Sequence, residues 1–155
     1  MTTVEHATFT IERELPAGPK HAFRFFAEAE LKARWNECHP DWTVLEDVFD
    51  FREGGEERKR WLTGDGSEQT FRAHYLDIVP ARRVIYAYGM GLAGKRISAS
   101  LVTVEFSPKG AATRMLFTEQ AAYLGAGMNT EREAGTEWGL DRLVEVIAAE
   151  QAGVH

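Results

Sequence analysis

The strongest constraint on this chain is a run of six predicted strands between about Trp42 and Tyr123. Short segments rich in glycine and proline separate them: Gly54-Gly55, "GDGS" (64–67), "PARR" (80–83), "GMGLAG" (89–94) and "SPKGAA" (107–112). Such residues supply the backbone angles of tight turns, and tight turns join neighbouring antiparallel strands. Because strand twist accumulates across a sheet, the run predicts a curved antiparallel sheet.

The segments that flank this run complete one domain, residues 1–155. "ATFTIEREL" (7–15) alternates apolar and polar residues, which predicts a half-buried strand. "KHAFRFFAEAELKARW" (20–35) predicts two short helices that break near Ala29, with Gly18 as a cap and Pro19 in the first turn. A long helix is predicted over Asn129–Glu150. This order is typical of an α+β domain, with helices on one face of six to seven antiparallel strands.

The predicted long helix is apolar over only half of its buried face. One stripe carries Leu140, Leu143, Val144 and Ile147, and its N-terminal continuation carries Asn129, Arg132, Glu133 and Thr136. Unpaired polar groups in a dry core cost about 1–3 kcal/mol each. The polar half therefore either lines the mouth of a cavity or frays outside the fold. Trp138 lies on the opposite side, where it either forms a homodimer contact or packs under the preceding loop.

Composition narrows the classes of partner. The chain has 18 Lys and Arg against 24 Asp and Glu, a net charge of −6, with no basic stripe that would bind nucleic acid or an anionic membrane. No apolar run is long enough to span a bilayer, and the first ten residues lack the apolar segment of a secretory signal. The single cysteine, Cys38, excludes an internal disulfide. We expect a cytoplasmic protein.

Several motifs, in this order and spacing, resemble the helix-grip fold of the START-like (Bet v-like) superfamily, also called SRPBCC. They are Arg34-Trp35, "FDFREGG" (49–55), "YLDIVPARRVIYAY" (75–88), "VTVEFSPKGAATRMLFTE" (102–119) and "LDRL" (140–143). The nearest branch is the AHSA-type family, relatives of the activator of the heat-shock chaperone ATPase. The resemblance covers about Phe9 to Ala149. It implies a curved sheet around the long C-terminal helix, with a cavity between them.

The resemblance also implies a small hydrophobic or amphipathic ligand, but it does not fix one activity, because the superfamily includes binding proteins, cyclases and chaperone regulators. Three functions therefore stay open: ligand binding, a cavity enzyme of the cyclase, dehydratase or hydrolase type, and a chaperone-interacting regulator. The chain departs from the family pattern at Asn36, Glu119 and Thr136, where relatives often carry tryptophan, histidine and tryptophan. All three departures fall where the cavity is expected.

We expect aromatic and soft side chains on adjoining strands to line the cavity together with polar residues of the long helix. Tyrosine suits such a wall because it combines an apolar ring with a hydroxyl group, although core packing is the alternative for any single residue. The predicted ligand-binding residues are Trp35, Trp61, Tyr75, Tyr86, Tyr88, Met90, Phe117, Glu119, Arg132 and Thr136.

Glu119 is the one candidate catalytic residue. It shares the strand face of Met115 and Phe117, so it faces the cavity if they do. A carboxylate in an apolar pocket can act as a general acid or base. It could instead pair with Arg132 and orient a ligand, or a register break could turn it to solvent.

Three further motifs receive no chemical role. "NECHPDW" (36–42) holds potential metal ligands, but neighbours in an extended loop rarely converge on one ion, so no metal is expected. "GMGLAG" matches a nucleotide-binding pattern but leads into a strand rather than a helix, so no cofactor is expected. "EERKRWLT" (56–63) is so polar that we expect it to form an edge strand.

Overall fold

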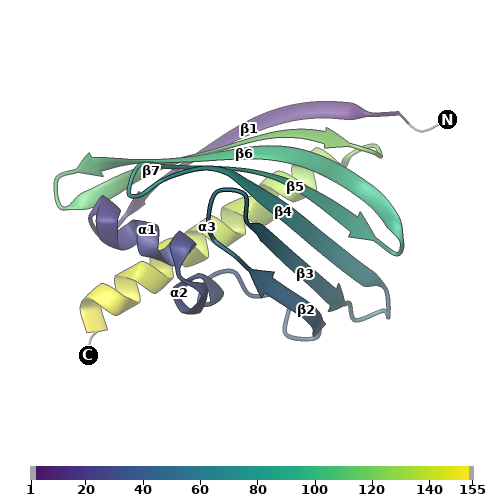
Figure 1. Ribbon diagram of the computed structural model, residues 1–155, viewed down its shortest axis with the longest axis horizontal. Helices are drawn as coiled ribbons and strands as arrows, with labels where there is room; N and C mark the ends of the chain where they lie inside the picture. The colour runs from purple at the N-terminus through teal and green to yellow at the C-terminus, as the bar shows by residue number, and fades with distance from the viewer. Residues whose placement is uncertain (1–2, 154–155) are drawn as a thin grey trace.

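Seven antiparallel strands form one curved sheet in the computed structural model, which describes residues 3–153 (Figure 1). The strands are β1 (Glu5–Leu15), β2 (Thr43–Phe49), β3 (Glu56–Leu62), β4 (Glu68–Val79), β5 (Arg83–Leu92), β6 (Lys95–Lys109) and β7 (Ala112–Tyr123). Their order across the sheet is β1-β7-β6-β5-β4-β3-β2. The predicted hairpins therefore join neighbours from β2 to β7, and β1 closes the sheet against β7.

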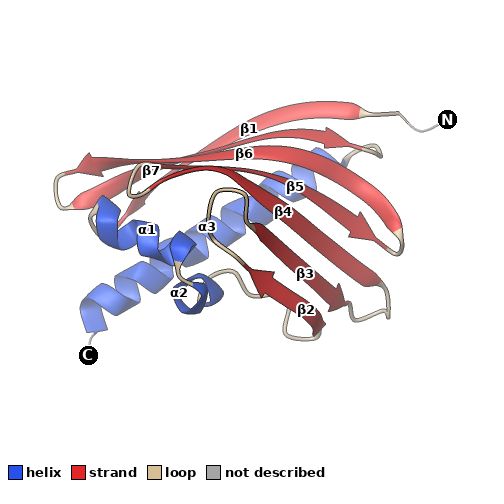
Figure 2. Cartoon of the chain, viewed as in Figure 1, coloured by secondary structure: helices blue, strands red, loops and turns tan. Residues whose placement is uncertain are grey.

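The helices lie together on the concave side of the sheet (Figure 2). They are α1 (Pro19–Ala27), α2 (Ala29–Ala33) and α3 (Met128–Gly153). Gly18 caps α1 and Pro19 occupies its first turn, while Glu28 adopts an extended conformation that separates α1 from α2. The predicted α+β helix-grip arrangement is confirmed. Within residues 3–153, no helix combines the length and the apolar character needed to cross a membrane.

The C-terminal half of α3 packs into a dry core, as its apolar stripe predicts. Leu140, Leu143 and Ile147 are buried and join one hydrophobic cluster with residues of β1, β7 and α1. The cluster includes Phe9, Ile11, Leu15, Ala22, Phe25, Met115 and Phe117. Burial of this stripe fixes the position of α3 across the concave face, because each fully buried leucine or isoleucine contributes about 1.5–3 kcal/mol.

The N-terminal half of α3 is a continuous part of the same helix, so the interpretation in which it frays outside the fold is wrong. Arg132 and Thr136 are half-buried on the side that faces the sheet. Trp138 is 65% exposed, so the interpretation in which it packs under the preceding loop is also wrong. A dimer contact through Trp138 stays a prediction.

The expectation that residues 56–63 form an edge strand is wrong. β3 lies between β2 and β4, and the edges are β2 and β1. Its charges divide between the two faces of the sheet. Arg60 pairs with Glu46 and Glu68 on the outer face, whereas Glu57 is buried on the concave face. A strand can be polar on both faces without being an edge when its inner face lines a polar cavity rather than a dry core.

We expect Leu143→Ala to lower the free energy of unfolding by about 2–5 kcal/mol, because the substitution leaves a cavity in the core. Trp138→Ala on the exposed side of the same helix is the control, with an expected change within about 0.5 kcal/mol. Urea denaturation at two protein concentrations measures both. Equal losses would contradict this packing, and a concentration-dependent loss in Trp138→Ala alone would place Trp138 in a dimer contact.

Candidate functional site

A cavity of about 460 Å³ lies between the concave face of the sheet and the N-terminal half of α3. Exposed lining residues on the 36–42 loop and on α3, including Glu37 and Glu131, mark its opening. The structure places all of the predicted ligand-binding residues in its lining: Trp35, Trp61, Tyr75, Tyr86, Tyr88, Met90, Phe117, Glu119, Arg132 and Thr136. Their role in binding a ligand remains a proposal. Asn36, one of the three positions at which the sequence departs from the family pattern, also lines the cavity.

Two glycines on α3 help to leave this space open. Gly135 and Gly139 are one helical turn apart and both line the cavity. Apart from the adjoining backbone of α3 itself, a Cβ atom added to either residue would meet no atom within 4 Å. The glycines therefore widen the cavity rather than allow a close approach between backbones.

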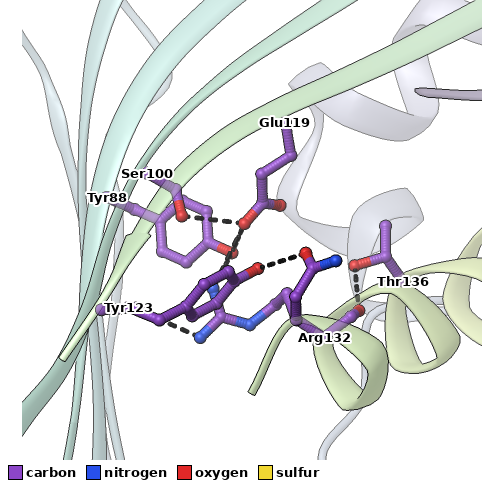
Figure 3. A network of polar contacts seen from close by, with 8 residues as sticks. Tyr88, Ser100, Glu119, Tyr123, Arg132 and Thr136 are labelled. Carbon is purple, nitrogen blue, oxygen red and sulfur yellow. Dashed lines mark hydrogen bonds and ion pairs between the residues drawn. The ribbon is translucent and has the colours of Figure 1, made fainter. Parts of the chain in front are cut away.

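The first polar centre of the cavity surrounds Glu119 on β7, which is 1% exposed (Figure 3). Its Oε2 atom accepts hydrogen bonds from the Tyr88 hydroxyl at 2.7 Å, the Ser100 hydroxyl at 2.8 Å and Arg132 Nη1 at 3.2 Å. Arg132 also donates to the Tyr88 hydroxyl at 2.8 Å and to Ser98 Oγ at 2.7 Å. The alternative in which Glu119 turns to solvent is therefore wrong.

Two members of this centre, Tyr88 and Arg132, have shifted pKa values. Burial, and then the nearby charge of Glu119, raise the pKa of Tyr88, so its hydroxyl stays a donor at neutral pH. Burial disfavours the Arg132 cation, but Tyr88 and Glu119 outweigh that effect and raise its pKa. Among the described residues, Glu119 Oε1 has no hydrogen-bond donor, and Figure 3 shows it without a contact. One oxygen is thus anchored and the other is available.

The second polar centre surrounds Glu57 on β3, which is also 1% exposed. Its Oε1 atom accepts hydrogen bonds from Lys32 Nζ at 2.5 Å and from the Tyr75 hydroxyl at 2.8 Å. Lys59 Nζ lies 3.4 Å from its Oε2 atom. Burial opposes ionisation of Glu57, but the charges of Lys32 and Lys59 outweigh it and hold the pKa of Glu57 below its ordinary value. Burial lowers the pKa of Lys32.

Aromatic rings connect the two centres. The ring centroids of Tyr75 and Tyr86 are 5.7 Å apart, and those of Tyr86 and Tyr88 are 6.0 Å apart. The ring centroid of Phe71 lies 4.9 Å from that of Tyr88. Burial raises the pKa of Tyr86 well above its ordinary value, so this hydroxyl is also neutral. The ring centroids of Trp42 and Trp61, which also line the cavity, are 6.2 Å apart. The cavity is therefore an aromatic space between two charged centres.

Sequence reasoning missed Lys32, Glu57 and Lys59. Two signals could have found them. Glu57, Lys59 and Trp61 alternate along one strand, so the two charged residues must share the cavity face predicted for Trp61. Lys32 precedes Trp35 by three residues, a spacing that places both on one helical face. The assignment of this segment to a sheet edge hid the first signal.

Two of the sequence motifs, residues 36–42 and 89–94, were predicted to bind neither a metal nor a nucleotide. Residues 3–153 contain no group of three or more His, Cys, Asp or Glu side chains placed to hold a metal ion. "GMGLAG" ends β5 and forms the turn into β6, with positive φ angles at Ala93 and Gly94. No helix follows this turn, so the phosphate-binding arrangement is absent from it.

Comparison with known proteins gives the family. The profile of the family described as Activator of Hsp90 ATPase homolog 1-like protein matches residues 16–148. The chain belongs to this family. A comparison with the curated proteins finds no match. The cavity lining extends from Phe26 to Leu140, so all of it lies within the segment that matches the family.

Solved structures resemble this chain over most of its length. A protein from Rhizobium leguminosarum is 45% identical with a TM-score of 0.90, covering 97% of this chain and 99% of that one. A protein from Rhizobium loti is 39% identical with a TM-score of 0.86, covering 93% and 99%. An AHSA1-like protein from Aeromonas hydrophila, 19% identical with a TM-score of 0.71 over 96% and 97%, shares the fold.

We expect Glu57→Gln to lower the free energy of unfolding by about 3 kcal/mol at neutral pH, because it leaves the Lys32 ammonium without its counter-charge. The pKa of Glu57 is lowered from 4.5 in the folded state. Its ionised form therefore stabilises the protein above pH 4.5, and this contribution is lost as the pH falls through the folded pKa.

The difference between wild type and Glu57→Gln should thus be larger at pH 7 than at about pH 2, as measured by urea denaturation. Glu56→Gln is the matched control, because Glu56 is the adjacent carboxylate on the outer face and pairs with Arg72. Glu56→Gln should lower the free energy of unfolding by less than Glu57→Gln does. A difference for Glu57→Gln that stays constant with pH would show that its charge does not stabilise the fold.

Proposed function

We propose that this member of the family binds a small hydrophobic or amphipathic molecule in the cavity between the sheet and α3. The observation that carries the proposal is the composition of the walls: aromatic rings from four strands and α1, with the buried charged groups confined to two hydrogen-bonded centres. Small-molecule sites are typically roughly 300–1,000 Å³ in volume and mostly apolar, with a few fixed polar groups. The cavity of about 460 Å³ lies in that range.

The fixed polar groups would orient such a ligand. Three donors hold Glu119 in place through one oxygen, and its second oxygen is available to accept a hydrogen bond from a ligand hydroxyl or amine. The Tyr86 hydroxyl, which lines the cavity, offers a neutral donor between the two centres. Groups that are already held in position lose little conformational freedom on binding, which favours affinity.

A cavity enzyme of the cyclase, dehydratase or hydrolase type is the alternative, and the available oxygen of Glu119 is the observation that favours it. The contacts of Glu119 argue for the orienting role, because Arg132, Tyr88 and Ser100 together hold the carboxylate in one position. The contacts described above all belong to the cavity. They therefore favour small-molecule binding over the role of a chaperone-interacting regulator.

We expect Gly139→Leu to block the cavity while the helix remains intact. Apart from the adjoining helix backbone, no atom lies within 4 Å of the added Cβ, and replacing a helical glycine adds about 1 kcal/mol of helix propensity. The fluorescent probe N-phenyl-1-naphthylamine, a neutral aromatic molecule, should bind wild type and should bind Gly139→Leu at least about tenfold more weakly, a change that corresponds to the loss of one good contact.

Ala134→Leu adds the same side chain at an exposed position of α3 outside the cavity lining, and it should leave probe binding unchanged. Equal binding to wild type and Gly139→Leu would place the probe elsewhere. No binding of this neutral probe to wild type would contradict the proposed function for neutral aromatic ligands.

The enzymatic alternative makes a different prediction for Glu119→Gln. Native mass spectrometry of the protein purified from the cells that make it gives the mass of any bound molecule. If Glu119 is catalytic, wild type converts that molecule on incubation and Glu119→Gln binds it without conversion. If Glu119 orients the ligand, its mass stays the same with both proteins and Glu119→Gln holds it more weakly, since one charge-assisted hydrogen bond is lost.

A further inference from the structure

The buried charges of the cavity do not cancel. Three cations, Lys32, Lys59 and Arg132, have side chains that are 13–15% exposed, and two carboxylates, Glu57 and Glu119, are almost completely buried. Arg132 pairs with Glu119, and Lys32 pairs with Glu57. One positive charge, that of Lys59, is therefore left in excess inside the cavity.

Lys59 is only weakly satisfied by the protein. Its ammonium group carries three hydrogen-bond donors. Its one ionic contact among the described residues is Glu57 Oε2 at 3.4 Å, and that oxygen forms no hydrogen bond. Glu57 already accepts hydrogen bonds from Lys32 and Tyr75 through its other oxygen. The donors of Lys59 are therefore available to a ligand in the cavity that they line.

Other acidic groups near the cavity do not neutralise this charge. Asp47 lies opposite Lys59 in the β2–β3 register, but it is exposed and not within 4.0 Å of the ammonium. Glu37 and Glu131 line the opening and are exposed to solvent. Water and salt screen exposed charges, whereas a charge held inside a cavity is screened much less. The interior thus favours one additional negative charge.

On the side of β4, Lys59 adjoins an aromatic and then an apolar side chain. Phe71 is its partner across the β3–β4 pair, and Met90 is the partner of Phe71 across β4–β5. Partners that face each other across antiparallel strands project to the same side of the sheet. A flat apolar body that lies against Phe71 and Tyr88 would therefore have Lys59 at its edge.

We infer that the ligand is an amphipathic monoanion whose negative group contacts Lys59 and whose apolar body lies against Phe71, Tyr86 and Tyr88. This inference rests on the proposed function and narrows it, because it selects acids over neutral molecules of the same shape. The charge of Lys59 acts at the end of the cavity formed by β3, whereas Glu119 acts on the far side of the aromatic wall.

A matched pair of probes tests this inference. 8-Anilinonaphthalene-1-sulfonate and N-phenyl-1-naphthylamine share one aromatic body, and only the first carries a negative group. Fluorescence titration of wild type should give a dissociation constant for the sulfonate at least about tenfold lower than for the neutral amine, because charge-assisted contacts are the stronger ones. Cooperative thermal unfolding of each protein excludes probe binding to a partly unfolded state.

Three variants separate the causes of such a preference. Lys59→Met should bring the two dissociation constants within about twofold of each other, since it removes the charge-assisted contact and leaves the apolar walls in place. Lys59→Arg keeps the charge and should keep the preference. Lys20→Met removes the same charge from an exposed position on α1, so it controls for the net charge of the protein and should change nothing.

Each outcome has one meaning. Loss of the preference in Lys59→Met alone supports the inference. Equal binding of both probes to wild type, or a preference that survives in Lys59→Met, overturns it and leaves the proposed function standing. Binding of neither probe to wild type overturns the proposed function, and the inference falls with it.

Discussion

The change of character along α3 at Gly139 and Leu140 determines the rest of the structure. A curved sheet leaves a concave face that another element must cover, and α3 crosses that face (Figure 1). From Leu140 onward its stripe is apolar and closes a dry core. Before that point, the stripe consists of small and polar residues, which neither fill the space nor tolerate a dry contact. The cavity is the consequence of one helix with two kinds of inner face.

The two buried carboxylates are not explained by stability. Removing charges from water costs several kcal/mol for each ion, and replacement of a buried ion pair by apolar residues is often neutral or stabilising. Glu57 and Glu119 nevertheless lie on the concave face, each with a cation and a tyrosine hydroxyl as partners. A wall of this kind costs stability relative to an apolar one. Its advantage is the fixed position of polar groups inside the cavity, which points to recognition.

Local patterns predicted the fold well because they report backbone geometry. Glycine- and proline-rich turns located every hairpin, and Gly18 with Pro19 located the start of α1. The face of Glu119 also followed from strand parity with Phe117. The charged strand β3 was wrongly predicted to be an edge. Its composition indicates that both faces of the strand have polar surroundings. It does not indicate whether those surroundings are bulk solvent or a cavity. That distinction depends on α2, which brings Lys32 to Glu57 from 25 residues away.

The charges on the surface and the charges inside the cavity would act on an anionic ligand in opposite directions. A net charge of −6 and the exposed carboxylates at the opening repel an anion as it approaches. Salt limits that repulsion to about 8 Å at physiological ionic strength, so it weakens association without preventing it. Inside the cavity, the ammonium of Lys59 and the aromatic walls would contact the ligand directly, and water screens their interactions with it only weakly. Selectivity for an anion would therefore be expressed in slow dissociation, the step in which most differences of affinity between related ligands arise.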